Sequence, residues 1–177
     1  LGDVYKRQTQ SFRIEEPPVP VTLVNAAGVN INDYLLALRQ VPEPVLAAFN
    51  AAGWTYRIDF DYMGGLSKKL NMSCIGATNY SQKTIYLSEA SATLHEFGHF
   101  LDWMLGFPAE YEQLFRAEAS AAPLRNYAKT DSREYFADCF AYWVKYAENA
   151  NAISLLQECA PMTYRYMEDL MRIANRL

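Results

Sequence analysis

Residue types that carry chemistry or charge are scarce in this chain. Only two histidines occur in 177 residues, and the three cysteines form no CxxC or CxxH pair, which excludes a disulfide framework and a thiolate zinc site. Positive charge is also limited, since 16 Lys and Arg against 20 Asp and Glu leave a net charge of −4. No global basic field is therefore available to hold a nucleic acid. No apolar run approaches the roughly 18 residues that a membrane-spanning helix requires, so we expect neither a nucleic-acid partner nor a membrane span.

The residues that are present give the composition of a folded domain. Hydrophobic residues make up 51% of the chain and aromatic residues 14%, and the length is sufficient for one core. Residues 1–10 resemble translated adaptor sequence and have no signal-peptide pattern, so we interpret them as a non-native leader and expect the natural N-terminus to be missing. Residues 11–177 are then expected to form a single domain.

The hydrophobic pattern predicts an α+β fold with two lobes. The N-terminal lobe, about residues 11–90, is expected to hold a small mixed sheet with helices. The C-terminal lobe, about residues 91–177, is expected to be helical. Strands are predicted at 21–24, 54–60, 72–77 and 84–87, and helices at 32–38, 45–52, 91–105, 108–120, 132–147, 153–159 and 162–174. Gly64 and Gly65 predict a turn or a flexible loop.

The two histidines lie in the sequence His95-Glu96-Phe97-Gly98-His99, which is the HExxH pattern inside a predicted helix. Residues four apart share one helix face, so both imidazoles can bind one metal ion. Glu96 projects to one side, where it can act as a base toward a water molecule at the metal. The alternative is a helix that carries two histidines by coincidence. Gly98 indicates close approach by a strand or substrate, or tight packing of helices.

A catalytic zinc site of this kind needs a third protein ligand, which in the subclass with glutamate comes from a later helix. No histidine remains, and Glu134 at the start of the predicted helix 132–147 is the best candidate. Its spacing from Asp131 also fits a capping box, so spacing alone leaves the two roles open. Asp138 lies one turn after Glu134 and can accept a hydrogen bond from a ligating histidine.

Three other acidic residues are rivals for the third position: Glu118, Glu110 and Asp102. Asp102 has a further interpretation, because it lies on the metal face of its helix, three residues after His99. It is either an outer hydrogen-bond partner of the site or a solvated residue near the helix end.

Three segments together resemble a known family. The segments His95–Asp102, Asn126-Tyr127 and Glu134–Tyr142 resemble the zinc metallopeptidases of the anthrax lethal factor type, and among them the small secreted Pro-Pro endopeptidases. The resemblance covers about residues 75–170 well and the first seventy weakly. It implies a gluzincin-like domain with the zinc-binding helix between two lobes, Zn²⁺ as cofactor, a peptide or protein substrate, and a secreted or cell-surface location. We also expect a monomer.

The resemblance implies roles for individual residues. His95, His99 and Glu134 match the zinc ligands, and Glu96 matches the general base. Tyr127 matches a tyrosine whose hydroxyl stabilises the oxyanion of the reaction.

The chain departs from the family at two positions. Asp138 stands where the family often has glutamate, which weakens the expected contact to a histidine, and Arg133 stands where an acidic residue is common. The segment with Ile75, Gly76 and Ala77 occupies the place of the substrate-binding sheet edge, where we expect a peptide to bind as an added strand. An ordinary interior strand is the alternative.

The sequence therefore predicts a zinc-dependent endopeptidase, with proline near the cut bond suggested only by the resemblance. One alternative is a non-catalytic, toxin-like binding module that retains the metallopeptidase fold. Glu96 argues against it, because a binding module needs no base at that position. A second alternative is a zinc hydrolase that uses the same ligands on a non-peptide substrate.

Overall fold

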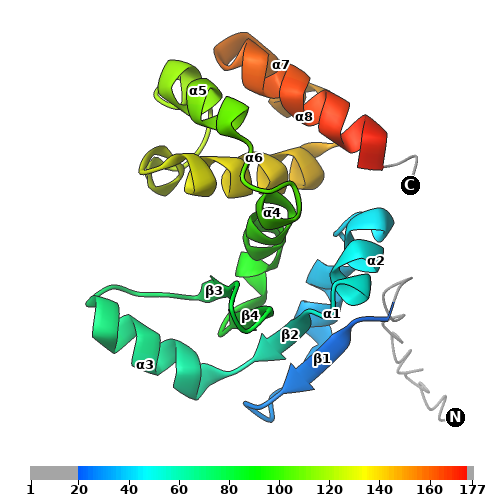
Figure 1. Cartoon of the computed structure of the whole chain (residues 1–177), viewed down its shortest axis with the longest axis vertical. Coiled ribbons are helices and arrows are strands. Elements are labelled where there is room, and N and C mark those ends of the chain that lie inside the picture. Colours follow the sequence, from blue (N-terminus) through cyan, green and yellow to red (C-terminus); the bar gives the residue numbers. More distant parts are fainter. Residues whose placement is uncertain (1–19, 175–177) are drawn as a thin grey trace, which may run out of the picture.

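A computed structural model of the chain describes residues 20–174, and it is an α+β fold (Figure 1). The prediction of a non-native leader at residues 1–10 lies outside the described residues. A small sheet with three helices forms the lower part of the molecule, and five helices with two short 3₁₀ turns complete it. The predicted fold class is confirmed. Within the described part, no helix combines the length and apolar character that crossing a bilayer demands.

The sheet has four short strands in the order β1-β2-β4-β3. The strands are β1 (Thr22–Asn25), β2 (Thr55–Ile58), β3 (Gly76–Asn79) and β4 (Thr84–Leu87). The β1–β2 and β2–β4 pairs are parallel, whereas β3 and β4 form an antiparallel hairpin, with Ala77 opposite Tyr86. Strand β3 is therefore an edge strand, and its outer side is open.

Strand β3 begins four residues later than the sequence pattern predicted. Residues 72–75 use their backbone groups elsewhere: the Cys74 N–H donates to Ser67 Oγ, and the Ile75 carbonyl accepts from Ser88 N–H. These bonds tie the segment to the preceding helix and to the end of β4. Residues 72–75 are consequently a connection that leads into the strand.

Three helices accompany the sheet: α1 (Asn32–Leu38), α2 (Glu43–Ala51) and α3 (Phe60–Leu70). The prediction of a turn at Gly64 and Gly65 was wrong, because both lie inside α3. The Asp59 carboxylate caps this helix by accepting from Tyr62 N–H, and Asn71 ends it in the left-handed conformation. Caps of this kind offset the cost of about 1 kcal/mol that each glycine adds to a helix.

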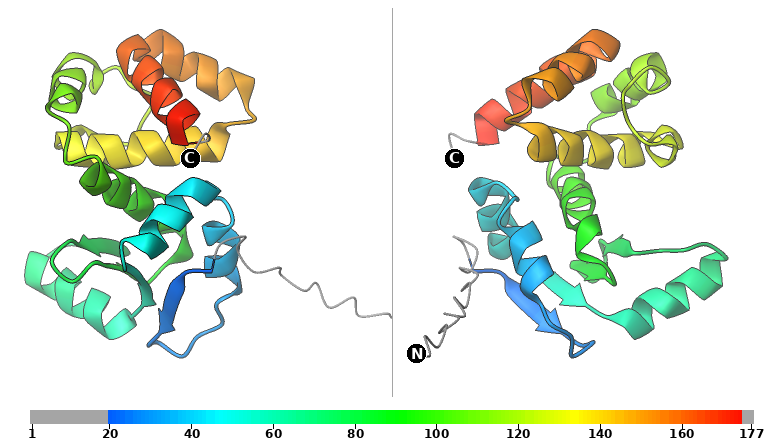
Figure 2. Two further views of the ribbon diagram at one scale, coloured as in Figure 1. Left: turned by 45° about the vertical axis from the view of Figure 1, so that its right-hand side comes forward. Right: turned by 180° about the vertical axis from the view of Figure 1, so that it is seen from behind.

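Helix α4 (Thr93–Met104) follows the 3₁₀ turn η1 (Ala90–Ala92) and lies between the sheet and the helical lobe (Figure 2). Its aromatic side chains complete the core, with the Phe97 ring 4.9 Å from that of Phe49 and the Phe100 ring 5.2 Å from that of Trp54. One face of α4 therefore packs on the sheet side of the core, and the opposite face is left to contact the helical lobe.

The helical lobe stacks on top of α4 (Figure 2). Its elements are α5 (Ala109–Glu118), η2 (Asn126–Lys129), α6 (Ser132–Tyr146), α7 (Ala150–Cys159) and α8 (Pro161–Ala174). Helices α4 and α6 cross closely, since a Cβ atom on Gly98 would lie 2.6 Å from the Ala137 Cα. Of the two interpretations of Gly98, tight packing of helices is the one observed. This crossing brings the first turns of α6 over the histidines of α4.

Candidate active site

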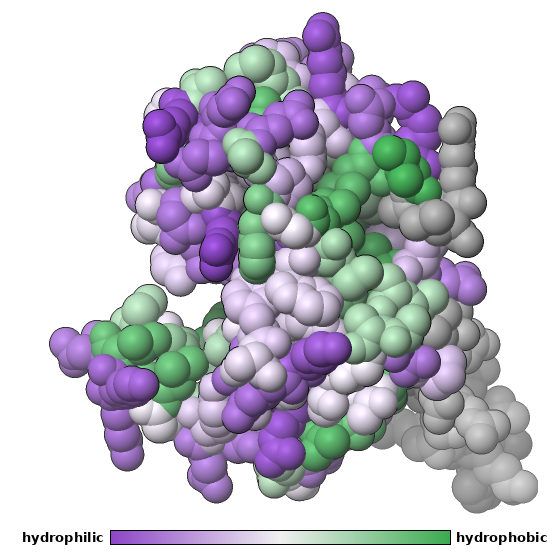
Figure 3. All heavy atoms as spheres, in the orientation of Figure 1, coloured by the Kyte–Doolittle hydropathy of each residue, from purple (hydrophilic) through white to green (hydrophobic). Residues whose placement is uncertain are grey.

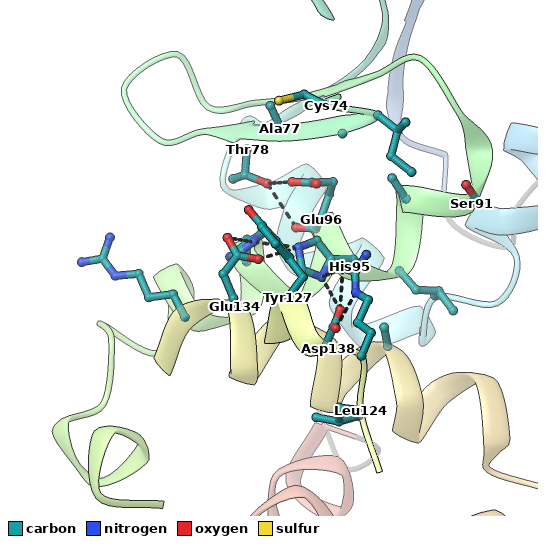
Figure 4. Close-up of a pocket in the computed structure, with 18 of the residues that line it drawn as sticks. Cys74, Ala77, Thr78, Ser91, His95, Glu96, Leu124, Tyr127, Glu134 and Asp138 are labelled. Carbon is teal, nitrogen blue, oxygen red and sulfur yellow. Dashed lines mark hydrogen bonds and ion pairs between the residues drawn. The ribbon is translucent and has the colours of Figure 1, made fainter. Parts of the chain in front are cut away.

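Three side chains that could hold a metal ion converge where α4 and α6 cross (Figure 4). His95 Nε2 lies 3.1 Å from His99 Nε2 and 3.1 Å from Glu134 Oε2, and His99 Nε2 lies 3.5 Å from Glu134 Oε1. All three ligand atoms lie within 4.8 Å of one another. The residues expected to bind zinc from the sequence are thus brought together by the fold.

The donor set fits a zinc ion. Tetrahedral Zn²⁺ with bonds of 2.0–2.1 Å to two imidazoles separates their nitrogens by about 3.3 Å, close to the observed 3.1 Å. His95 Nδ1 bonds Asp138 Oδ1 at 2.6 Å, which leaves its Nε2 lone pair directed at the centre. Glu134 Oε2 is buried and lies 3.1 Å from His95 Nε2. A bound cation would compensate the charge of this buried carboxylate.

The charges of the cluster are strongly coupled. Burial lowers the pKa of His95, but hydrogen bonds with Asp138 and Glu134 outweigh it and raise the pKa to about 9. Burial raises the pKa of Glu134, yet hydrogen bonds with His95 and His99 hold it well below its ordinary value. Without a metal, the His95 imidazole therefore keeps its second proton near neutral pH, held between the Asp138 and Glu134 carboxylates. A divalent cation would replace that proton.

Glu134 has the location of a capping residue but a different contact. The Asp131 carboxylate caps α6 by accepting from the backbone N–H groups of Arg133 and Glu134 at 2.9 and 3.0 Å. The Glu134 side chain instead faces His95 and His99. Only half of a capping box is present, and the glutamate is left available to the cluster.

The rival carboxylates lie elsewhere. Glu118 is buried and accepts from the N–H groups of Met162 and Thr163 at 2.9 and 2.8 Å, so it caps α8. Glu110 is exposed in the first turn of α5.

Asp102 is 3% exposed and so is not a solvated residue. Burial raises its pKa to about 6, against the opposing charge of His99. No hydrogen bond joins it to His99 in the described part of the chain, where His99 Nδ1 has no partner.

Asp138 contacts His95 directly despite being shorter than the glutamate common in the family. It also forms a bidentate ion pair with Arg125, through Nε–Oδ2 at 2.6 Å and Nη2–Oδ1 at 2.7 Å. The Arg125 guanidinium lies 5.4 Å from the centre of the Tyr127 ring. Arg125 thus links two residues predicted from the sequence, but it was not itself predicted, because only tertiary folding brings residues 121–130 to α6.

Glu96 is buried with its carboxylate between β3 and the metal-binding cluster. Its Oε2 accepts a hydrogen bond from the Thr78 hydroxyl at 2.7 Å. A Cβ atom on Gly76 would lie 2.5 Å from Glu96 Oε1, so only glycine permits this approach. Thr78 was missed in the sequence analysis, although a glycine within a strand is a recognised indicator of such close contact.

Tyr127 lies on η2, with its ring centre 6.4 Å from that of His95 and 43% of the residue exposed. Partial burial, followed by the charge of Glu134, raises the pKa of its hydroxyl to about 12. The phenol therefore remains protonated near neutral pH and can donate a hydrogen bond toward the cluster's open side.

A cleft of about 1060 Å³ contains all of these groups. One wall is formed by Ile75 and the edge strand after it, including Gly76 and Ala77, and the other by η2 and α6. Apolar side chains of α3, including Leu66 and Leu70, extend the first wall. Figure 3 shows the surface hollowed between α3 and the helical lobe. The cleft therefore holds the edge of β3 and the cluster in one continuous space.

Comparison with known proteins gives two matches. The sequence model described as "Anthrax toxin lethal factor, N- and C-terminal domain" matches residues 56–170. The solved structure of the PRO-PRO endopeptidase PPEP-2 from Paenibacillus alvei superposes with a TM-score of 0.63 and 19% sequence identity, covering 84% of this chain and 96% of that chain. None of the curated protein sequences matches the chain. The two chains therefore share a fold.

Proposed function

The chain belongs to the anthrax toxin lethal factor family, and on that premise we propose that it is a zinc-dependent endopeptidase acting on peptides or proteins. One observation carries the proposal. The trio His95, His99 and Glu134 lies within 4.8 Å beside the buried Glu96 carboxylate, at the floor of a cleft with an open strand edge. A binding module would need the cleft, but it would not need a base beside the metal site.

His95, His99 and Glu134 would hold the zinc ion, which when bound supplies positive charge that polarises the scissile carbonyl and the attacking water. Glu96 accepts a proton from the attacking water as its oxygen bonds to the carbonyl carbon. The same carboxylate then delivers the proton to the leaving amine nitrogen. Thr78 holds Glu96 Oε2 through its hydroxyl and so fixes the direction of this carboxylate.

The remaining groups position the substrate and the ligands. The Tyr127 hydroxyl donates a hydrogen bond to the carbonyl oxygen as negative charge builds there. The substrate backbone pairs with the free edge at Gly76 and Ala77 as an added strand, and Ile75 contacts it just before the strand. Asp138 accepts from His95 Nδ1 and so keeps the imidazole in the tautomer that a metal ligand requires.

The test is incubation of the protein with a mixed peptide library, with and without a chelator, and identification of cut sites by mass spectrometry. Chelator-sensitive cleavage at defined bonds is the expected result. Glu96→Gln should keep zinc but lose cleavage, while Glu134→Ala should lower zinc affinity. A Glu96→Gln protein that cuts at the wild-type rate would contradict the mechanism, and zinc binding without any cleavage would favour the binding module.

A preference for proline beside the cut bond is part of the proposal, supported by the shared fold with a Pro-Pro endopeptidase. Peptides that differ only by proline or alanine at each position around the cut measure it directly. Secretion or a cell-surface location, and a monomeric state, stay predictions.

A further inference from the structure

We propose that Arg133 binds a carboxylate of the substrate, so that the cleft prefers an acidic residue close to the scissile bond. The inference rests on the proposed peptidase function and specifies its substrate class. Arg133 is the residue immediately before Glu134 in the first turn of α6, and it lines the cleft. Its side chain is exposed, so the guanidinium is accessible to a substrate in the cleft.

The guanidinium is held by an aromatic ring. Its central carbon lies 4.2 Å from the centre of the Phe107 ring. Phe107 follows α4 with a φ of 53°, a left-handed conformation that is unfavourable for a bulky residue. Stacking occupies the flat face of the guanidinium and leaves the N–H groups on its edge available, which is the arrangement that binds a carboxylate with two parallel hydrogen bonds.

Arg133 has no acidic partner within residues 20–174. Arg57, Arg116, Arg125 and Arg172 each pair with an Asp or Glu side chain, whereas no ion pair includes Arg133.

The acidic groups nearest to Arg133 are engaged elsewhere. The Asp131 carboxylate caps the helix through backbone N–H groups, and Glu134 faces the histidines. Asp102 is buried. The charge of Arg133 therefore remains available to a ligand in the cleft.

The local charge explains why a cation is needed there. Asp138 pairs with Arg125 and Glu134 faces the histidines, whereas Glu96 has no ion pair among the described residues and accepts from the Thr78 hydroxyl. A substrate carboxylate beside Glu96 would therefore be repelled without a nearby cation. Lys145 also lines the cleft, but it lies twelve residues further along α6, about 18 Å at 1.5 Å per residue. Arg133 is thus the cation placed to act beside the reacting bond, and Lys145 provides a matched control.

The experiment starts from one peptide that the zinc-loaded wild type cuts. Amidated versions carry Glu or Gln at each of the three positions on either side of the cut, and kcat/KM is measured for each. We expect Glu to be preferred about tenfold at one position. Arg133→Gln should abolish the preference, Arg133→Glu should favour Lys at that position, and Lys145→Gln should leave the preference intact. A second peptide set with free C-termini is compared with the amidated set. The comparison shows whether Arg133 binds a side-chain carboxylate or the C-terminal carboxylate.

Absence of any Glu preference, or a preference that survives Arg133→Gln, overturns the inference while leaving the peptidase proposal standing. If no peptide is cut, the proposed function fails separately. Recognition is then measured as binding of fluorescein-labelled, amidated alanine-rich peptides with one Glu or one Gln. Tighter binding of the Glu peptide by the wild type, lost in Arg133→Gln, supports the inference, and equal affinities overturn it. Equal zinc content and equal Tm of the variants exclude misfolding as the cause.

Discussion

At the scale of single residues, the carboxylate of Glu96 depends on one hydroxyl. Thr78→Val keeps the shape of the side chain but removes the 2.7 Å hydrogen bond to Glu96 Oε2. Loss of a partner for a buried charged group costs about 1–3 kcal/mol, so we expect kcat to fall roughly tenfold or more while zinc content stays unchanged. Thr78→Ser retains the hydroxyl and should keep most of the activity. Equal kcat for the Val variant and wild type would show that Thr78 does not position the base.

Asp102 gives a pH-dependent prediction for the metal-free protein. Its pKa is raised to about 6 by burial, above the unfolded value near 3.9. The folded state therefore holds this proton more tightly, and stability falls as pH rises from about 4 to about 6. Asp102→Asn has no charge to bury and should be more stable at pH 7 by up to about 3 kcal/mol, with little difference at pH 3.5. Urea unfolding at both pH values, with chelator present, measures this, and a destabilised Asn variant at pH 7 would contradict it.

Among the site residues expected from the sequence, the two histidines are those whose geometry is local. His95 and His99 share a helix face by spacing alone, and the fold brings Glu134 to them as expected. Thr78 and Arg125 were not predicted, because each reaches the site from another element. A threonine on a strand or an arginine in a loop has no local feature that indicates its partner. The contacts Thr78–Glu96 and Arg125–Asp138 exist only after β3 and residues 121–130 have packed.

At the scale of elements, the crossing of α4 and α6 depends on Gly98. A methyl group there would lie 2.6 Å from Ala137 Cα, on backbone that cannot move aside without shifting α6. We expect Gly98→Ala to destabilise the protein by about 1–3 kcal/mol and to weaken zinc binding, because the crossing also sets the distance from Glu134 to the histidines.

Gly64→Ala is the matched control for this substitution. Gly64 lies in the exposed middle of α3 with nothing within 4 Å of an added Cβ, so alanine should stabilise by about 0.5–1 kcal/mol. Thermal unfolding of the two variants should therefore move in opposite directions. A neutral Gly98→Ala would show that the two helices separate easily.

The elements of the helical lobe were predicted best, because the apolar periodicity and the capping residues indicate the same helix boundaries there. The N-terminal lobe was predicted less well for two physical reasons. Gly64 and Gly65 suggested a turn, but the cap at Asp59 and the helix end at Asn71 determine the local structure. Residues 72–75 have strand-forming side chains, but their backbone hydrogen bonds go to Ser67 and to the residues after β4.

At the scale of the whole molecule, a bound metal would join α4, which packs on the sheet, to α6, which belongs to the helical lobe. Zinc at 100 times its Kd would stabilise the fold by about 2.7 kcal/mol. For a chain of this length a chelator should then lower Tm by roughly 5–10 °C. Differential scanning calorimetry measures the shift, and Glu134→Ala should show a smaller one. No change in Tm on adding zinc to the metal-free protein would exclude a site of this strength.

Metal uptake should also release a proton at pH 7. The pKa of His95 in the metal-free protein is about 9, so the imidazole is protonated at pH 7 and must lose its proton to bind a metal. Release of about one proton per zinc is expected at pH 7, declining toward zero above pH 10. Calorimetric titration in buffers of different ionisation enthalpy counts these protons. A release that does not change with pH would contradict the raised pKa.

The open edge of β3 has a consequence for how the protein behaves at high concentration. Unpaired backbone groups that could pair with a substrate strand could also pair with any other extended chain, including one from a partly unfolded copy. The edge has only four residues, Gly76–Asn79, and it borders the buried negative charge of Glu96. A short edge beside an acidic floor offers few bonds to an intruding apolar strand. The shortness of β3 and the carboxylate beside it thus limit aggregation along the sheet, although the edge is open.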